Sequence, residues 1–198
     1  MNPRWHPLWR IARLPAPAVL SILLVLTSVN AGLGLSAAGR APVRRSGESI
    51  WALEVQPGRA QRILDTWKEA KVLHLAREAV AWDFAFIAGY TAVLSIACLA
   101  FARRWGWFRR WGLRLGWLAL LVGALDVLEN IGLLQMLLRE ETGQPLGDWP
   151  VITAAFSWPK WLLLIPFVAF LPVAAGRAYR RELGGRPAPA RAGAPASG

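Results

Sequence analysis

The sequence predicts an all-α integral membrane protein, a four-helix bundle that crosses the bilayer. Of its 198 residues 55% are hydrophobic, and four long apolar runs lie at about 15–36, 79–102, 112–138 and 150–175. Each run is near or above the roughly 20 residues that a helix needs to cross the hydrocarbon core. No run alternates as a strand does. Because a chain in lipid must close its backbone hydrogen bonds within each segment, the runs are expected to be helices.

The placement of charge predicts that both termini are cytoplasmic. Arginines crowd the N-terminal segment, the connection between the second and third runs, and the C-terminal tail, whereas the third connection sets Arg139 against Glu140, Glu141 and Asp148. By the positive-inside rule the arginine-rich segments lie in the cytoplasm. The net charge of +11 is therefore interpreted as a topology signal and a contact with membrane lipid, and no nucleic-acid partner is expected.

Residues 1–14 are predicted to form a short cytoplasmic arm before the first span. Trp5, Trp9 and the arginines beside them are typical of an anchor at the membrane interface. A cleaved signal peptide is an alternative for the first run, because Ser36, Ala37 and Ala38 resemble a cleavage site. The apolar core is longer than the roughly 7–15 residues of such a signal, which favours a retained helix.

The first connection is predicted to carry an amphipathic helix at about 57–77, on the extracytoplasmic side. It follows a loop and the short apolar patch SIWALEV, and Pro57 suits the first position of a helix. Apolar residues then recur at helical spacing, at Ala60, Ile63, Leu64, Trp67 and Ala70. Such a helix either lies on the interface and caps the bundle, or forms a lid over a site between the spans.

Three of the spans carry polar residues, and each charge at a helix centre costs roughly 2.5–3.5 kcal/mol in lipid. The candidate binding residues are Asp83, Tyr90, Asp126, Glu129, Asn130, Ser157, Lys160 and Trp161. Within a span they are separated by one, three, four or seven positions, so each helix presents one polar stripe. Stripes that avoid lipid are predicted to face each other.

These stripes predict a polar pocket in the outer half of the membrane. At 1.5 Å per residue, Asp83 lies roughly 6 Å and Lys160 roughly 15 Å below the outer surface. The pocket is expected to open to the extracytoplasmic side, beneath the first connection. Three acids face one lysine, so Lys160 is expected to pair with one carboxylate, and repulsion favours the protonated form of at least one other acid.

Neither a metal site nor a cofactor is predicted. Cys98 is the only cysteine and is interpreted as a packing residue in the second run. His6 and His74 are the only histidines, and both occur in polar surroundings along the sequence. No nucleophile motif or cofactor fingerprint accompanies the polar residues.

In combination, the polar residues resemble a pattern of small, uncharacterised bacterial membrane proteins with four helices. That pattern has an aspartate and a tyrosine in one span, D-x-x-E-N in the next and S/T-x-x-K in the last. Here its members are Asp83, Tyr90, Asp126, Glu129, Asn130, Ser157 and Lys160. The segment LEVQPGRAQRILDTW is also similar to that group, and the likeness covers roughly residues 50–170. The resemblance implies a shared fold and site in a bacterial cytoplasmic (inner) membrane, and it implies no activity.

Three classes of function remain open. The first is a protein that binds, or helps to move, an amphiphile, a lipid headgroup or a cation in the polar pocket. The second is a small membrane enzyme acting on a lipid or isoprenoid-like substrate, with Asp126 and Glu129 as general acid and base and Lys160 or Asn130 stabilising charge. The third is a structural subunit whose polar residues hold helices together, at an average of about 0.6 kcal/mol for each hydrogen bond.

Four spans are few for a transporter that works alone. The first class of function therefore implies a homo-oligomer or a partner membrane protein, and Gly112 and Gly116 offer a close helix contact. Residues 15–178 are predicted to form a single membrane domain. Residues 179–198 are predicted to be a disordered cytoplasmic tail, because they are rich in Pro, Ala and Gly.

Overall fold

A computed structural model describes residues 5–40, 46–104 and 109–184, and no strand occurs among them. Three helices in this part are long and apolar enough to cross a membrane: α6 (Leu73–Arg104), α7 (Arg109–Glu141) and α8 (Trp149–Gly184). A helical, membrane-type fold is thereby confirmed. Residues 1–4 of the predicted arm, and residues 185–198 of the predicted tail, lie outside the described residues.

The first apolar run forms the helix α2 (Ala16–Arg40). Its fully described part contains the apolar stretch Ser21–Gly34, which is not among the three candidate spans. The crossing of the membrane by α2, and with it the count of four spans, stays a prediction.

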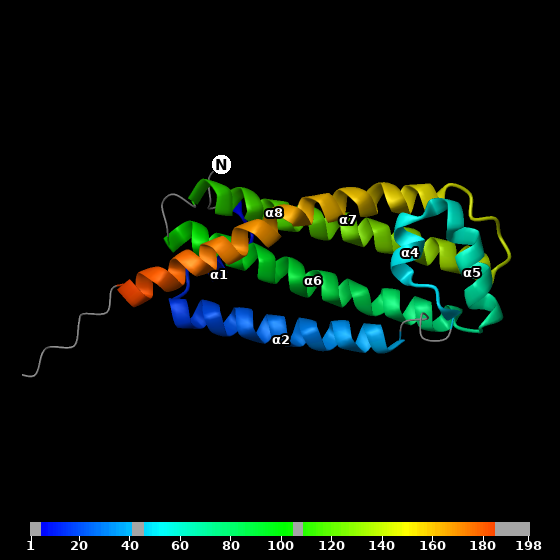
Figure 1. The fold of residues 1–198 in the computed structure, drawn as a ribbon, viewed down its shortest axis with the longest axis horizontal. Helices are drawn as coiled ribbons and strands as arrows, with labels where there is room; N and C mark the ends of the chain where they lie inside the picture. Colours follow the sequence, from blue (N-terminus) through cyan, green and yellow to red (C-terminus); the bar gives the residue numbers. More distant parts are fainter. Residues whose placement is uncertain (1–4, 41–45, 105–108, 185–198) are drawn as a thin grey trace, which may run out of the picture.

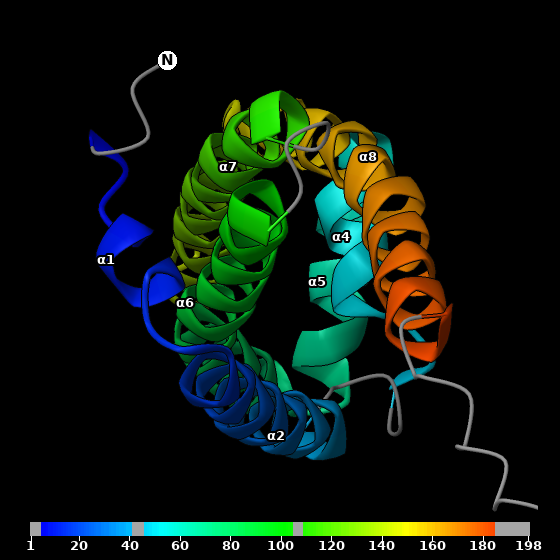
Figure 2. The ribbon, with the colours of Figure 1, turned by 90° about the vertical axis from the view of Figure 1, so that its left-hand side faces the viewer.

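The long helices form an arc in which each packs mainly on its neighbour (Figures 1 and 2). Along the arc α2 packs on α6, α6 on α7, and α7 on α8. We call the end where α6 stops and α7 starts the arginine-rich end, and the end where α7 stops and α8 starts the acidic end. Figure 1 has the arginine-rich end on the left. A short helix, α1 (Trp9–Ala12), lies against α6 near the arginine-rich end.

Two glycines allow α6 and α7 to approach closely. A Cβ at Gly112 would lie 2.5 Å from the backbone oxygen of Cys98 and 2.7 Å from the Cβ of Ala102. A Cβ at Gly116 would lie 3.1 Å from Leu99. The two glycines that were expected to support contact with another subunit are therefore buried inside the chain, against α6. Cys98 is a buried free thiol in the same contact.

The first connection contains, from residue 50 on, the helix α4 (Ile50–Val55), the 3-10 helix η2 (Pro57–Arg59) and the helix α5 (Ala60–Glu69). Ser49 caps α4, since its Oγ accepts a hydrogen bond from the backbone N–H of Ala52 at 3.1 Å. The single amphipathic helix expected at 57–77 is divided, because Lys71 turns the chain with φ of 56°. Residues 73–77 belong to α6, which starts earlier than the expected position 79.

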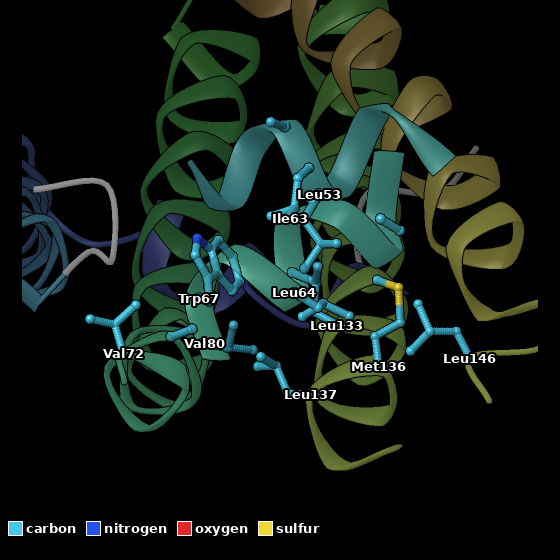
Figure 3. Close-up of a cluster of buried hydrophobic side chains, with 13 residues drawn as sticks. Leu53, Ile63, Leu64, Trp67, Val72, Val80, Leu133, Met136, Leu137 and Leu146 are labelled. Carbon is cyan, nitrogen blue, oxygen red and sulfur yellow. The ribbon is translucent and has the colours of Figure 1, made fainter. Parts of the chain in front are cut away.

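The helix α5 covers the acidic ends of α6 and α7 with its apolar face (Figure 3). Its side chains Ile63, Leu64 and Trp67 are fully buried. They pack with a set of residues from the neighbouring elements, namely Leu53, Val72, Val80, Leu133, Met136, Leu137 and Leu146. The apolar periodicity read from the sequence thus belongs to a buried face of α5, as both a cap and a lid require.

Polar contacts hold this cap on α7. Glu140 is buried, and its carboxylate accepts hydrogen bonds from Lys68 Nζ at 2.7 Å and Gln61 Nε2 at 3.0 Å. The Lys68 pKa is raised by that hydrogen bond and by the charge of Glu140. The C-terminal helix differs from the expected boundary as well: α8 continues to Gly184, so residues 179–184, which were predicted to belong to the disordered tail, are helical.

Candidate functional site

Lys160 of α8 lies at the centre of a buried cluster of charges. Its Nζ donates to Asp126 Oδ1 at 2.8 Å and to Glu129 Oε1 at 2.9 Å, and it lies 2.8 Å from Glu129 Oε2. Asp126, Glu129 and Lys160 are all buried, and Glu129 has no exposed surface. The lysine was expected to pair with one carboxylate; in the structure it contacts two.

Helical spacing explains how α7 presents both acids to Lys160. Asp126 and Glu129 are three residues apart, so they lie on one face, which α7 turns toward α8. One turn further on, a Cβ at Gly132 would overlap Thr153 Oγ1 of α8. The absence of a side chain at Gly132 therefore brings α8 close enough for the lysine to reach both carboxylates.

Tyr90 connects α6 to the same cluster. Its hydroxyl donates to Asp126 Oδ2 at 2.6 Å, so both carboxylate oxygens of Asp126 have a donor. Tyr90 is partly buried, and its ring lies beside that of Phe86. A second pair lies next to this one, in which Asn130 Nδ2 donates to Asp83 Oδ2 at 2.8 Å. Both hydrogen bonds join α6 to α7, so the polar stripes of these two helices face each other.

The two other residues predicted on α8 have different environments. Ser157 is fully buried one turn before Lys160, and its Oγ makes no hydrogen bond in the described part of the chain. Trp161 is 44% exposed, and its ring centroid lies 5.2 Å from Lys160 Nζ. Trp161 thus lies at the edge of the cluster, in cation–π contact with the lysine.

Glu54 of α4 is a member of the cluster that the sequence reasoning missed. Its carboxyl hydrogen-bonds to Glu129 and feels the charges of Lys160 and Asp126. The helix α4 packs on α7 and α8 with buried neighbours on both sides of Glu54, which are Leu53 and Val55. One signal was available, because Glu54 is the only acid of the short apolar patch SIWALEV.

The pKa of Glu54 is raised to about 8, mainly by burial and then by the charge of Glu129, while the charge of Lys160 opposes both effects. Glu54 is thus mostly protonated at neutral pH and can donate its proton in a hydrogen bond to Glu129. Oε2 of Glu129 forms an ion pair with Lys160 Nζ at 2.8 Å and accepts no hydrogen bond from the described groups. A protonated Glu54 adds a second donor to the Glu129 carboxyl group.

An apolar groove starts where the charged cluster ends. It has a volume of about 540 Å³ and lies between Leu94 of α6 and the stretch of α8 from Trp161 to Pro172. Trp161 and Pro172 are eleven positions apart, so at 1.5 Å per residue the groove is about 16 Å long. Its walls are aliphatic and aromatic, among them Leu164, Phe167 and Val168. Trp161, in contact with Lys160, joins the groove to the cluster.

Within the described residues, no group of three or more His, Cys, Asp and Glu side chains is arranged to hold a metal ion. Comparisons with protein-family models, with curated proteins and with solved structures give no match.

Proposed function

We propose that the protein binds an amphiphile, with the polar head of the ligand at the Lys160 cluster and its apolar chain in the groove along α6 and α8. The observation that carries this proposal is the continuity of the two features at Trp161. A buried charged cluster alone would suit an ion, and an apolar groove alone would suit any lipid tail. Ligand sites typically combine a few convergent polar groups with apolar walls, as this pair does.

The charge balance of the cluster favours a head that donates hydrogen bonds. Four carboxyl groups, of Glu54, Asp83, Asp126 and Glu129, surround one ammonium group. An additional anion would be repelled, whereas an amine or hydroxyl head would find acceptors. The proposed ligand is therefore a long-chain amine or a lipid with a hydroxyl-rich head, rather than a phosphate ester.

The proposed setting is a bacterial cytoplasmic membrane with the arginine-rich end in the cytoplasm. In that orientation the cluster lies in the outer half of the bilayer. The helices α4 and α5 then lie on the extracytoplasmic side, where Glu54 would meet an arriving head. A homo-oligomer or a partner membrane protein would be needed if the ligand is also moved across the bilayer.

The proposal is tested with a photoreactive long-chain primary amine and the matching alkyl phosphate, added to the full chain in detergent. The amine is expected to label α8 between Trp161 and Pro172, and the phosphate is not. Glu129→Gln should reduce amine labelling about tenfold or more, because the loss of one hydrogen bond to a charged group weakens binding by about that factor. Glu141→Gln, which removes an exposed acid of α7, is the matched control. Equal labelling of both variants would reject the site.

Acid–base catalysis is a second candidate, favoured by the contact between Glu54 and Glu129. Neighbouring carboxyl groups in different protonation states suit proton transfer, with Glu54 as the acid and Glu129 as the base. Asp126 is less available than expected, because Lys160 and Tyr90 occupy both of its oxygens. Turnover of a lipid extract that is lost in Glu54→Gln, while the amine still binds, would favour the enzyme. A structural subunit would show neither labelling nor turnover.

A further inference from the structure

A second cavity lies at the arginine-rich end, far from the Lys160 cluster. It has a volume of about 460 Å³ and lies between α2, the segment after α1, and the last turns of α6. Its apolar wall includes Leu14, Val19, Leu23, Ala97 and Phe101. The volume falls in the range of roughly 300–1,000 Å³ that is typical of ligand pockets.

Of the described residues that line this cavity, two are arginines and none is an acid. The guanidinium of Arg103 is held in place, since its Nη1 donates to the backbone oxygen of Ala12 at 2.9 Å. Arg13 follows directly in the chain and also lines the cavity. Neither residues 1–47 nor residues 84–125 contain an Asp or a Glu. The positive charge at this end of α1, α2, α6 and α7 is thus not balanced by acids of the same segments.

Part of the cavity wall is formed by the N-terminal segment, and contacts hold this segment at His6 and at Ala12. At one end His6, expected in polar surroundings, is 2% exposed and lies between α6 and α7. Its Nδ1 accepts from the Leu8 N–H at 3.2 Å, and its Nε2 lies 3.3 Å from Ser95 Oγ. At the other end Arg103 holds Ala12. Contacts within the chain therefore fix the segment that forms this wall.

We propose that this cavity binds one anionic phospholipid, with the phosphate between Arg13 and Arg103 and an acyl chain on the apolar wall. Guanidinium groups recognise phosphate oxygens through paired N–H donors. A lipid uses the apolar wall as well as the arginines, whereas a free phosphate ion would use the arginines alone. Two unbalanced cations favour an anionic headgroup over a zwitterionic one. The lining of this cavity shares no described residue with the groove of the proposed amphiphile site.

Native mass spectrometry of the full chain in detergent tests the proposal. Phosphatidylglycerol and phosphatidylcholine with the same acyl chains are titrated separately, and inorganic phosphate is added as a competitor. One phosphatidylglycerol is expected to bind, at least about tenfold more tightly than phosphatidylcholine, since each arginine near a lipid surface is worth about fivefold. Equal affinity for the two lipids, or displacement of the lipid by millimolar phosphate, would reject an anionic lipid site.

Substitutions distinguish lipid binding in the cavity from unspecific attraction by the positive charge of the arginine-rich end. Arg13→Gln keeps the Arg103 contact with Ala12 and is expected to lower the lipid preference about fivefold. Arg110→Gln removes the same charge from an exposed position of α7 that does not line the cavity, and should leave the preference unchanged. Leu23→Trp should block both lipids by filling the cavity. Equal effects of Arg13→Gln and Arg110→Gln would reduce the proposal to unspecific attraction.

Discussion

Among the described residues of its cluster, Lys160 is the only cation. Its removal is therefore expected to lower the stability of the protein more than the removal of one acid does. Lys160→Met leaves Asp126 and Glu129 buried without a counter-charge, which is expected to cost about 3–5 kcal/mol of stability. Asp126→Asn leaves Lys160 paired with Glu129 and should cost clearly less. Thermal unfolding of both variants in the same detergent measures the difference. Equal melting temperatures would contradict the central role of the lysine.

The raised pKa of Glu54 makes the stability of the protein depend on pH. Its folded-state pKa of about 8 exceeds the unfolded value of 4.5, so between these values the folded chain binds more protons than the unfolded chain. Stability must then fall as pH rises through this window, by an order of 2 kcal/mol after allowing for the partial exposure of Glu54. Glu54→Gln should remove this slope.

Thermal unfolding of the wild type and of Glu54→Gln between about pH 5 and pH 9 checks this expectation. Glu69→Gln, which removes an exposed acid of α5, is the control and should keep the slope. A slope that is identical in all three proteins would place the titration elsewhere.

Helical periodicity was enough to find most residues of the site. The spacing of Asp126 and Glu129 puts both on one face, and the cost of charge in lipid says that this face is covered. The number of partners of Lys160 could not be predicted, because it depends on the depth and rotation of α8 against α7. Glu54 was missed because it lies in a connection, and periodicity says nothing about where a connection folds back.

At the scale of the elements, the cap formed by α5 depends on Trp67. This side chain is fully buried, and its Nε1 donates to the Glu48 backbone oxygen at 3.2 Å. Trp67→Ala is expected to cost about 3–5 kcal/mol and to loosen α5 first. Hydrogen exchange in residues 60–69 measures the loosening. Trp51→Ala, at a position that is 53% exposed, should leave the exchange unchanged; equal protection in both variants would show that Trp67 does not hold the cap.

The contact between α6 and α7 depends on Gly112. A Cβ there meets backbone and Cβ atoms, neither of which can rotate away. Gly112→Ala is therefore expected to separate the helices and to lower the melting temperature by several degrees, as overpacking by about 1–3 kcal/mol does. Gly32→Ala places the same methyl group in open space on α2 and should be neutral. A stable Gly112→Ala variant would mean that the helices are further apart than described.

The division of the first connection was beyond prediction from the sequence. Residues after Lys71 continue a helical pattern, and no glycine or proline marks a break there. The left-handed backbone of Lys71 is imposed by packing, because the apolar face of α5 and the start of α6 both reach the same core. Tertiary contact outweighs local preference at this position.

At the scale of the whole molecule, four apolar runs predicted the long helices but not their neighbours. Hydropathy identifies a span without saying which other span it faces. The polar pairs of the site agree with the observed order, because they join α6 to α7 and α7 to α8, and none of these pairs includes a described residue of α2. This agrees with the position of α2 at one end of the arc.

The proposed orientation of the arc is open to direct measurement. With Cys98 replaced by alanine, a single cysteine at Asp148 is expected to react with an impermeant thiol reagent from outside the cell. A cysteine at Arg109 should react only after the membrane is opened. The reverse pattern would invert the molecule and place the Lys160 cluster nearer the cytoplasm.

The order of the charges along the chain also bears on biosynthesis. The ribosome makes Asp126 and Glu129 before Lys160, so α7 reaches the membrane with two acids whose counter-charge does not yet exist. A helix carrying two unpaired carboxylates partitions poorly into lipid. Stable insertion of α7 should therefore wait for α8, with the two helices leaving the insertion machinery as a hairpin joined by the short turn at residues 142–148.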